Sequence, residues 1–140
     1  MERAITQGPQ IIMVTDSNIS ILNKTKGKLP RLPFVQLKNK ILGEEYDLSL
    51  VFITSKESHK INLAYRGKDK PTNVLSFPLE KNSGEIFIDQ KTSTKDAPNF
   101  DMSPTKFIQF LVIHAMLHLK GFEHGSTMEK QEKKFLKIFS

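Results

Sequence analysis

The sequence contains no cysteine. Disulfides and thiolate metal ligands are therefore excluded, and any metal would have to be held by imidazole or oxygen ligands. No apolar run approaches the length of a membrane span, and no basic-then-apolar segment of the kind found in signal peptides opens the chain. We therefore expect a protein of the cytoplasm that does not enter a membrane.

Acidic residues are absent from one long stretch of the chain. The net charge is +6, and residues 24–40 hold six cations and no acid. A second basic group is offset by only Glu57 and Asp69; it comprises Lys56, Lys60, Arg66, Lys68 and Lys70. Such clustering fits a polyanion such as RNA, but a merely solvated basic surface explains it equally well.

Length and hydrophobic patterning predict one domain over residues 1–140. The predicted strands are Ile11–Val14, Leu48–Ile53, Val74–Phe77 and Glu85–Ile88. The predicted helices are Phe34–Leu42, ended by Gly43; Ser55–Tyr65, ended by Gly67; Pro104–Leu119, capped by Ser103; and a last one opened by a capping box from Ser126 to Glu129. The polar run Lys91–Asp101 is expected to be a loop.

Three histidines with regular spacing are the most informative feature. His114 and His118 are four residues apart, so they lie on one face of the predicted helix. Gly121 permits the left-handed turn that ends a helix, which lets the chain fold back and bring in His124. Three imidazoles at one point suit zinc and leave a fourth position for water, as in catalytic zinc sites. The helix is apolar nearly all round, so a shared metal would also resolve the cost of burying two imidazoles. Nickel or copper would fit the same ligands.

The residue after His114 argues against one class of zinc enzyme. Zinc peptidases with this spacing carry a glutamate there as the general base, whereas this chain has Ala115. A peptide or amide hydrolase therefore remains only an alternative. The remaining histidine, His59, is predicted to be a solvated surface residue.

Two sequence blocks carry a resemblance to a known family. They are Asn62–Pro78, which reads NLAYRGKDKPTNVLSFP, and His114–His124, which reads HAMLHLKGFEH and is followed by Met128–Glu132. Together they resemble the YbeY family, the bacterial rRNA maturation endoribonucleases. The likeness extends from about Leu48 to the C-terminus. Ala115, Phe122–Glu123 and Gly84–Glu85 depart conservatively from the residues usual in the family.

The resemblance implies an α+β fold, with a small mixed four-stranded sheet flanked by helices and a zinc site at the C-terminal end of a central buried helix. It implies one Zn²⁺ per chain, held by His114, His118 and His124. It also implies a single-strand-specific endoribonuclease that acts in small-subunit (16S) rRNA processing and ribosome quality control, with RNA and the small ribosomal subunit or its proteins as partners.

The chemistry expected is hydrolysis of an RNA phosphodiester by zinc-activated water. Arg66 is the candidate catalytic cation, because a guanidinium matches phosphate oxygens and stays charged. Lys68, Lys70, Thr72 and Asn73 are candidate RNA-binding residues, although a solvated turn would explain them too. Glu123 could orient a ligand histidine or be an exposed carboxylate, and no residue stands out as the general base. A non-catalytic ribosome-assembly factor that uses zinc only for stability is the second alternative.

Overall fold

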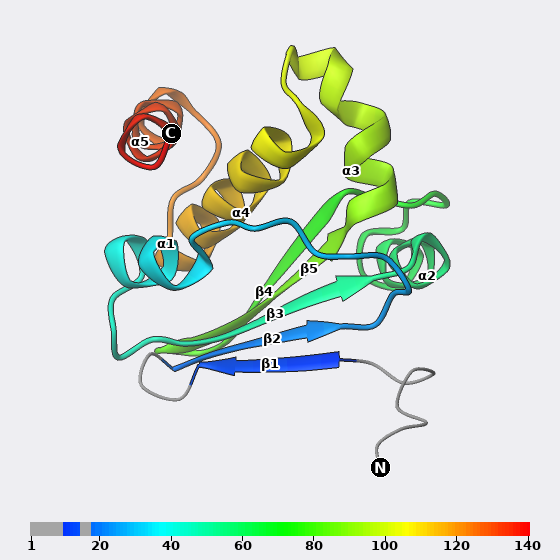
Figure 1. Cartoon of the computed structure of the whole chain (residues 1–140), viewed down its shortest axis with the longest axis horizontal. Helices are drawn as coiled ribbons and strands as arrows, with labels where there is room; N and C mark the ends of the chain where they lie inside the picture. The colour runs from blue at the N-terminus through cyan, green and yellow to red at the C-terminus, as the bar shows by residue number, and fades with distance from the viewer. Residues whose placement is uncertain (1–9, 15–17) are drawn as a thin grey trace.

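A computed structural model describes residues 18–140 in full and the backbone of residues 10–14 (Figure 1). The strands are β1 (Gln10–Val14), β2 (Ile19–Asn23), β3 (Asp47–Ile53), β4 (Val74–Glu80) and β5 (Ser83–Asp89). The helices are α1 (Phe34–Ile41), α2 (Ser55–Arg66), α3 (Gln90–Asp96), the 3-10 helix η2 (Ala97–Phe100), α4 (Pro104–Lys120) and α5 (Ser126–Ile138). None of the helices in the described ranges is long and apolar enough to cross a membrane.

The strands form one mixed sheet in the order β1-β2-β3-β5-β4. Strands β2, β3 and β5 run parallel, and β1 and β4 pair with them antiparallel at the two edges. The predicted α+β class with a mixed sheet is confirmed, but the sheet has five strands where four were expected. The extra strand is β2, whose short run includes the polar Ser20 and Asn23. Asn23 can be buried at the strand end because its amide donates to the carbonyl of Gly27 and its Oδ1 accepts from Thr25.

The core lies between the sheet and the helices α1, α4 and α5. Alternation along the strands places Leu50 and Phe52 of β3, with Ile86 and Ile88 of β5, in the same buried cluster. In Figure 1 these three helices lie on one side of the sheet, and α2 lies at the end where β2 and β3 finish.

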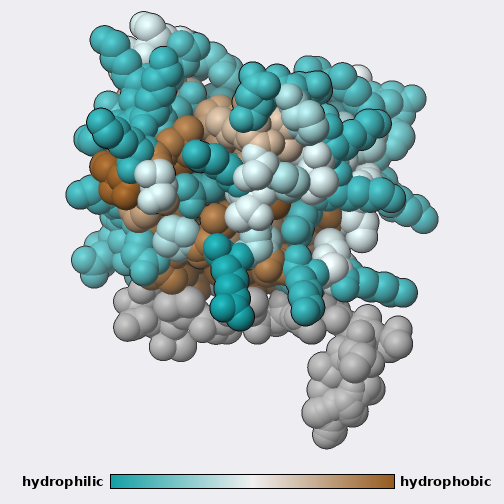
Figure 2. Space-filling model, turned by 45° about the horizontal axis from the view of Figure 1, so that its top comes forward, coloured by the Kyte–Doolittle hydropathy of each residue, from teal (hydrophilic) through white to brown (hydrophobic). Residues whose placement is uncertain are grey.

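On the face shown in Figure 2, hydrophilic residues surround several hydrophobic areas. Partly buried apolar residues of these helices that pack on the core include Val35, Phe110 and Leu136.

Helix α4 is capped at both ends, and its buried residues extend from Phe107 to Leu117. The Ser103 hydroxyl accepts a hydrogen bond from the backbone N–H of Lys106 at 3.2 Å, and Pro104 fills the first turn. Gly121 ends the helix at φ 113°, as expected, in a backbone region that side chains disfavour. The helix lies against β4 and β5, so its inner face looks onto the edge of the sheet.

Close packing of β5 on α4 depends on Gly84. A Cβ atom at this position would meet the Tyr46 hydroxyl and lie 3.0 Å from Cδ2 of Leu119. Tyr46 is buried, so it has little room to move away. The lack of a side chain at Gly84 therefore sets how closely the last turn of α4 approaches the sheet.

The prediction of a loop at Lys91–Asp101 was wrong. The segment forms most of α3 and all of η2, and Asp101 is the capping residue that follows η2. The helix begins because the buried carboxylate of Asp89 accepts from the backbone N–H of Thr92 at 3.0 Å and from its hydroxyl at 2.6 Å. The helix buries Ser93 rather than large apolar residues, so hydrophobic periodicity could not reveal it.

The predicted start of the last helix is also corrected. Helix α5 does begin at Ser126, but the capping residue is Gly125 at φ 152°, and no side chain caps the helix. Ser126 is thus the first helical residue, and the capping box expected from Ser126 to Glu129 does not form. A real capping box opens α2 instead, where Thr54 and Glu57 each bond to the other's backbone N–H.

Candidate metal centre

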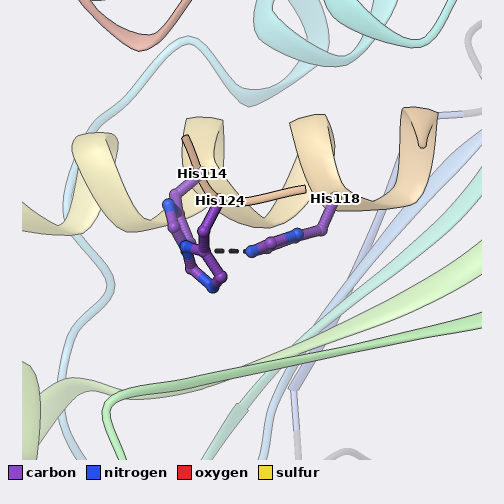
Figure 3. A group of neighbouring side chains, drawn as sticks. All are labelled: His114, His118 and His124. Carbon is purple, nitrogen blue, oxygen red and sulfur yellow. Dashed lines mark hydrogen bonds between the residues drawn. The ribbon is translucent and has the colours of Figure 1, made fainter. Parts of the chain in front are cut away.

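The three histidines converge beneath α4, as their spacing predicts (Figure 3). His114 and His118 project from one face of the helix, and His124 reaches them from the loop that follows Gly121. The Nε2 atoms of His114 and His118 are 3.1 Å apart. One nitrogen from each of the three rings lies within 4.8 Å of the others. Among the described residues, no other group of three such side chains gathers in this way.

Hydrogen bonds to the outer ring nitrogens fix how two of the histidines point. Nδ1 of His114 bonds to the carboxylate of Glu132 in α5, and Nδ1 of His118 lies 3.0 Å from the carbonyl oxygen of Phe122. A carbonyl oxygen can only accept, so Nδ1 of His118 carries the proton and its Nε2 keeps a free lone pair. The Nδ1 proton of His114 likewise points to the Glu132 carboxylate. The Nε2 lone pairs of His114 and His118 therefore face each other.

Two facing lone pairs at this distance can share a cation, either a proton or a metal ion. Zinc–nitrogen bonds of about 2.0–2.1 Å in a tetrahedral site put two ligand nitrogens about 3.3 Å apart. The 3.1 Å observed between His114 and His118 is close to that value. The donor set and its geometry therefore suit a metal such as zinc.

The surroundings of His118 favour its neutral, metal-binding form. Burial lowers the pKa of His118 below its ordinary 6.5, and the neighbouring His114 and His124 lower it further. The hydrogen bond to the Phe122 carbonyl and the charge of Glu132 oppose this shift without cancelling it. Fewer protons then compete with a metal for this ring at neutral pH.

The histidines open into a cleft of about 730 Å³ that follows strand β4. Strand β4 is at the edge of the sheet, and no further strand of the described residues pairs with its outer side. One wall comes from α4 and α5, and the other from β4 and the end of α2. Arg66, the last residue of α2, lines the same cleft as the histidines. Two segments far apart in the sequence are thus brought together, as the candidate site requires.

Asn62 ties Arg66 to the loop that precedes β4. This buried side chain lies one helical turn before Arg66, and its Oδ1 accepts from the guanidinium at 3.4 Å. Its amide donates to the carbonyl of Lys70 at 2.8 Å. The Asn62 side chain therefore connects the Arg66 guanidinium with the backbone of the loop that leads into β4.

The candidate RNA-binding residues divide into two pairs. Thr72 and Asn73 line the cleft, and the Asn73 amide donates to Asp96 of α3 at 3.0 Å. Lys68 and Lys70 are exposed but are not among the lining residues. The structure thus brings only Thr72 and Asn73 to the histidines' cleft.

Two of the cations in residues 24–40, Lys24 and Lys38, bond to other groups of the protein. Lys24 forms an ion pair of 2.6 Å with Glu57, and Lys38 is buried and donates to the carbonyl of Glu44 at 2.9 Å. Burial lowers the pKa of Lys38, against the raising effect of nearby acids. His59 lies at the surface as predicted, 2.7 Å from Asp69.

The partner of His114 was missed by sequence reasoning. Glu123, the carboxylate weighed for that role, is exposed, and the carboxylate that meets a histidine is that of Glu132. A signal was present in the sequence. Glu132 lies four residues after Met128 and three before Phe135, on the buried face of an amphipathic helix, where an acid needs a partner.

Fold and site together define a class: an α+β protein in which two histidines of the central helix and one from the loop that follows form a potential metal site in an open cleft. A family model described as Endoribonuclease YbeY matches residues 31–139. The chain belongs to the YbeY family.

Individual relatives agree with that assignment. An Endoribonuclease YbeY of Campylobacter jejuni is 40% identical over 102 residues, covering 67% of this chain and 76% of the relative. An Endoribonuclease YbeY of Phytoplasma mali is 38% identical over 117 residues, covering 79% and 78% of the two chains. The solution structure of TM1509 from Thermotoga maritima matches with a TM-score of 0.56 and 28% identity, over 74% of this chain and 77% of the other.

Proposed function

We propose that this chain is a zinc-dependent endoribonuclease that cleaves single-stranded RNA. The observation that carries the proposal is the meeting of three histidines and an arginine in one open cleft. Membership of a family whose named relatives are endoribonucleases supports the choice of RNA as substrate. Residues 1–140 act as one domain with one zinc ion, and the protein works in the cytoplasm.

His114, His118 and His124 are the proposed metal ligands. Glu132 and the Phe122 carbonyl hold the first two rings in the tautomer that turns Nε2 inward. When bound, zinc supplies a Lewis acid that acidifies a water molecule and polarises a phosphoryl oxygen. Ala115, the residue after the first ligand, lines the cleft but cannot accept a proton, which disfavours peptide hydrolysis.

Arg66 is the proposed catalytic cation. Attack of water on the phosphodiester gathers negative charge on the phosphoryl oxygens, and a guanidinium offers them two parallel N–H donors. Asn62 acts as a positioning residue, because it bonds to Arg66 and is itself buried. Thr72 and Asn73 lie where RNA would pass, whereas Lys68 and Lys70 would meet it outside the cleft.

The biological substrate proposed is the RNA of the small ribosomal subunit. Processing of 16S rRNA and ribosome quality control would place the protein beside the ribosome or its proteins. The net charge of +6 supports a polyanionic partner of this kind.

Cleavage of end-labelled single-stranded RNA tests this proposal directly. Zinc-loaded protein should cut the RNA, and the His114→Ala variant should not. A matched control is His59→Ala, because His59 is a surface histidine outside the cleft. No cutting by the zinc-bound protein, with or without small ribosomal subunits present, would overturn the proposal in favour of a non-catalytic assembly factor. Zinc-dependent digestion of a protein substrate instead would favour the peptidase alternative.

A further inference from the structure

The two most exposed tyrosine and phenylalanine side chains of the described surface both lie in the cleft. Among residues 18–140, five large hydrophobic side chains are notably exposed: Leu63, Tyr65, Leu79, Phe100 and Ile138. The two aromatic ones, Tyr65 at 73% and Phe100 at 51%, both line the histidine cleft. The three aliphatic ones do not. Exposing a large ring to water is unfavourable, so its restriction to one cleft points to a ligand there.

Phe100 is held by a stack of rings that leads to the histidines. Its ring stacks on buried Phe107 with centroids 4.8 Å apart and planes 24° apart. Phe110 lies 6.4 Å from Phe100 and 6.0 Å from the ring of His114. Since Phe107 covers one face of Phe100, much of the exposed area must come from the other face and the edges. The ring is thus held as a flat surface at one end of a row of rings that reaches His114.

Tyr65 offers a second ring on the other wall. It precedes Arg66 at the end of α2, and its ring meets that of Phe77 edge-on, with centroids 5.3 Å apart. Phe77 is held in turn by Phe87 of β5, 5.9 Å away. A T-shaped contact covers at most one face of the Tyr65 ring, in keeping with the high exposure of this residue.

We propose that Tyr65 and Phe100 are stacking surfaces for unpaired nucleobases of the RNA, one on each wall of the cleft. The inference rests on the proposed function and explains its selectivity. Bases in single strands can splay out and stack on aromatic side chains, whereas bases in an A-form duplex are covered by their neighbours. The two rings would therefore determine specificity for single-stranded RNA, while the histidines and Arg66 carry the chemistry.

Four variants separate ring stacking from simple packing. Phe100→Leu and Tyr65→Leu keep an apolar side chain but remove the flat ring, and Phe100→Tyr and Tyr65→Phe keep the ring. Leu79→Ala is the matched control, because Leu79 is 60% exposed on β4 but outside the cleft. Each leucine variant should raise KM for single-stranded RNA at least about fivefold, with a smaller effect on kcat. The ring-keeping variants and Leu79→Ala should stay within about twofold of the starting KM, since they keep the stacking faces.

A fluorescent base reports stacking without relying on cleavage. Single-stranded RNA that carries 2-aminopurine should lose fluorescence on binding the unaltered protein, and less so with each leucine variant. Unchanged KM and unchanged quenching in both leucine variants, alongside normal cleavage, would overturn the stacking inference and leave the proposed function intact. Ring-dependent quenching without any cleavage would overturn the proposed function and leave the stacking surfaces in place. A lower thermal stability with unchanged KM would mean that the rings serve packing alone, and would also overturn the inference.

Discussion

The imidazole of His114 and the carboxylate of Glu132 are hydrogen-bonded partners, although 18 positions separate them in the sequence. The bond joins α4 to α5 and leaves only Nε2 of His114 to face the other histidines. Because the Glu132 side chain is only 10% exposed, its carboxylate has little water to replace this partner. The last helix thus supports the proposed metal centre, although none of the three proposed ligands lies on it.

Removing that carboxylate should weaken metal binding. We expect Glu132→Ala to lower zinc affinity about 10- to 100-fold, the usual effect of losing a hydrogen-bond partner of a ligand histidine. Glu132→Gln should be milder, because an amide oxygen can still accept the bond. Competition with a chromophoric chelator measures the affinity. Glu129→Gln, an exposed position on the same helix, is the control, and equal affinities for all three variants would rule out this role for Glu132.

Arg66 should affect turnover and not metal content. We expect Arg66→Ala to bind one zinc as before and to lose about 100-fold in kcat, because a donor to the developing charge is gone. Arg66→Lys should recover only part of the loss, since an ammonium cannot make the paired contact. Metal analysis and single-turnover cleavage of the same samples provide the two readouts. Unchanged cleavage by Arg66→Ala would remove this residue from the mechanism.

The role of Asn62 can be divided into its two hydrogen bonds. Asn62→Ala loses both the Arg66 and the Lys70 contacts, so we expect kcat to fall and the free energy of unfolding to drop by about 1–2 kcal/mol. Asn62→Asp keeps an acceptor for Arg66 but loses the donor to Lys70. In Asn62→Asp, kcat should therefore return closer to its original value than the free energy of unfolding does. Denaturant unfolding and cleavage rates measured on both variants would show whether the two effects separate.

Acid should destabilise the metal-free protein through His118. The pKa of this ring is below 6.5 in the folded state, so the unfolded chain takes up the proton first as the pH falls. Stability from this residue is fully present above about pH 6.5 and is lost between that pH and the lower folded pKa. Denaturant unfolding of the metal-free protein at pH 7.5 and 5.5 measures the loss. A His118→Gln variant should show a shallower decline, and an equally steep one would place the proton uptake elsewhere.

A substitution at Gly84 tests the close packing of β5 against the last turn of α4, next to the site. We expect Gly84→Ala to cost about 1–3 kcal/mol in unfolding free energy, the usual range for overpacking a tight core. The added Cβ would press on Leu119 and Tyr46, next to the helix turn that carries His118. Thermal or denaturant unfolding measures this cost. Gly27→Ala is a control without such contacts, because the nearest atom there would be 3.8 Å away.

The sequence predicted best where a local pattern decides the structure. Helix geometry fixed the shared face of His114 and His118, and Gly121 marked the end of α4, after which the chain turns and brings in His124. Helix α3 was missed because a buried aspartate and serine hold it, and such polar contacts leave no hydrophobic period. The pairing of His114 with Glu132 needed the fold, since the packing of α5 on α4 creates it. The contact between Asn62 and Arg66 is local, one helical turn apart in α2, and helix spacing could have suggested it.

Titration of zinc into metal-free protein tests the central claim most directly. The cleavage rate of end-labelled single-stranded RNA should rise in proportion to added zinc and stop rising at one equivalent per chain. The His118→Ala variant should show no such rise. A cleavage rate that is independent of zinc, or equal in the variant, would contradict a catalytic metal held by these three histidines.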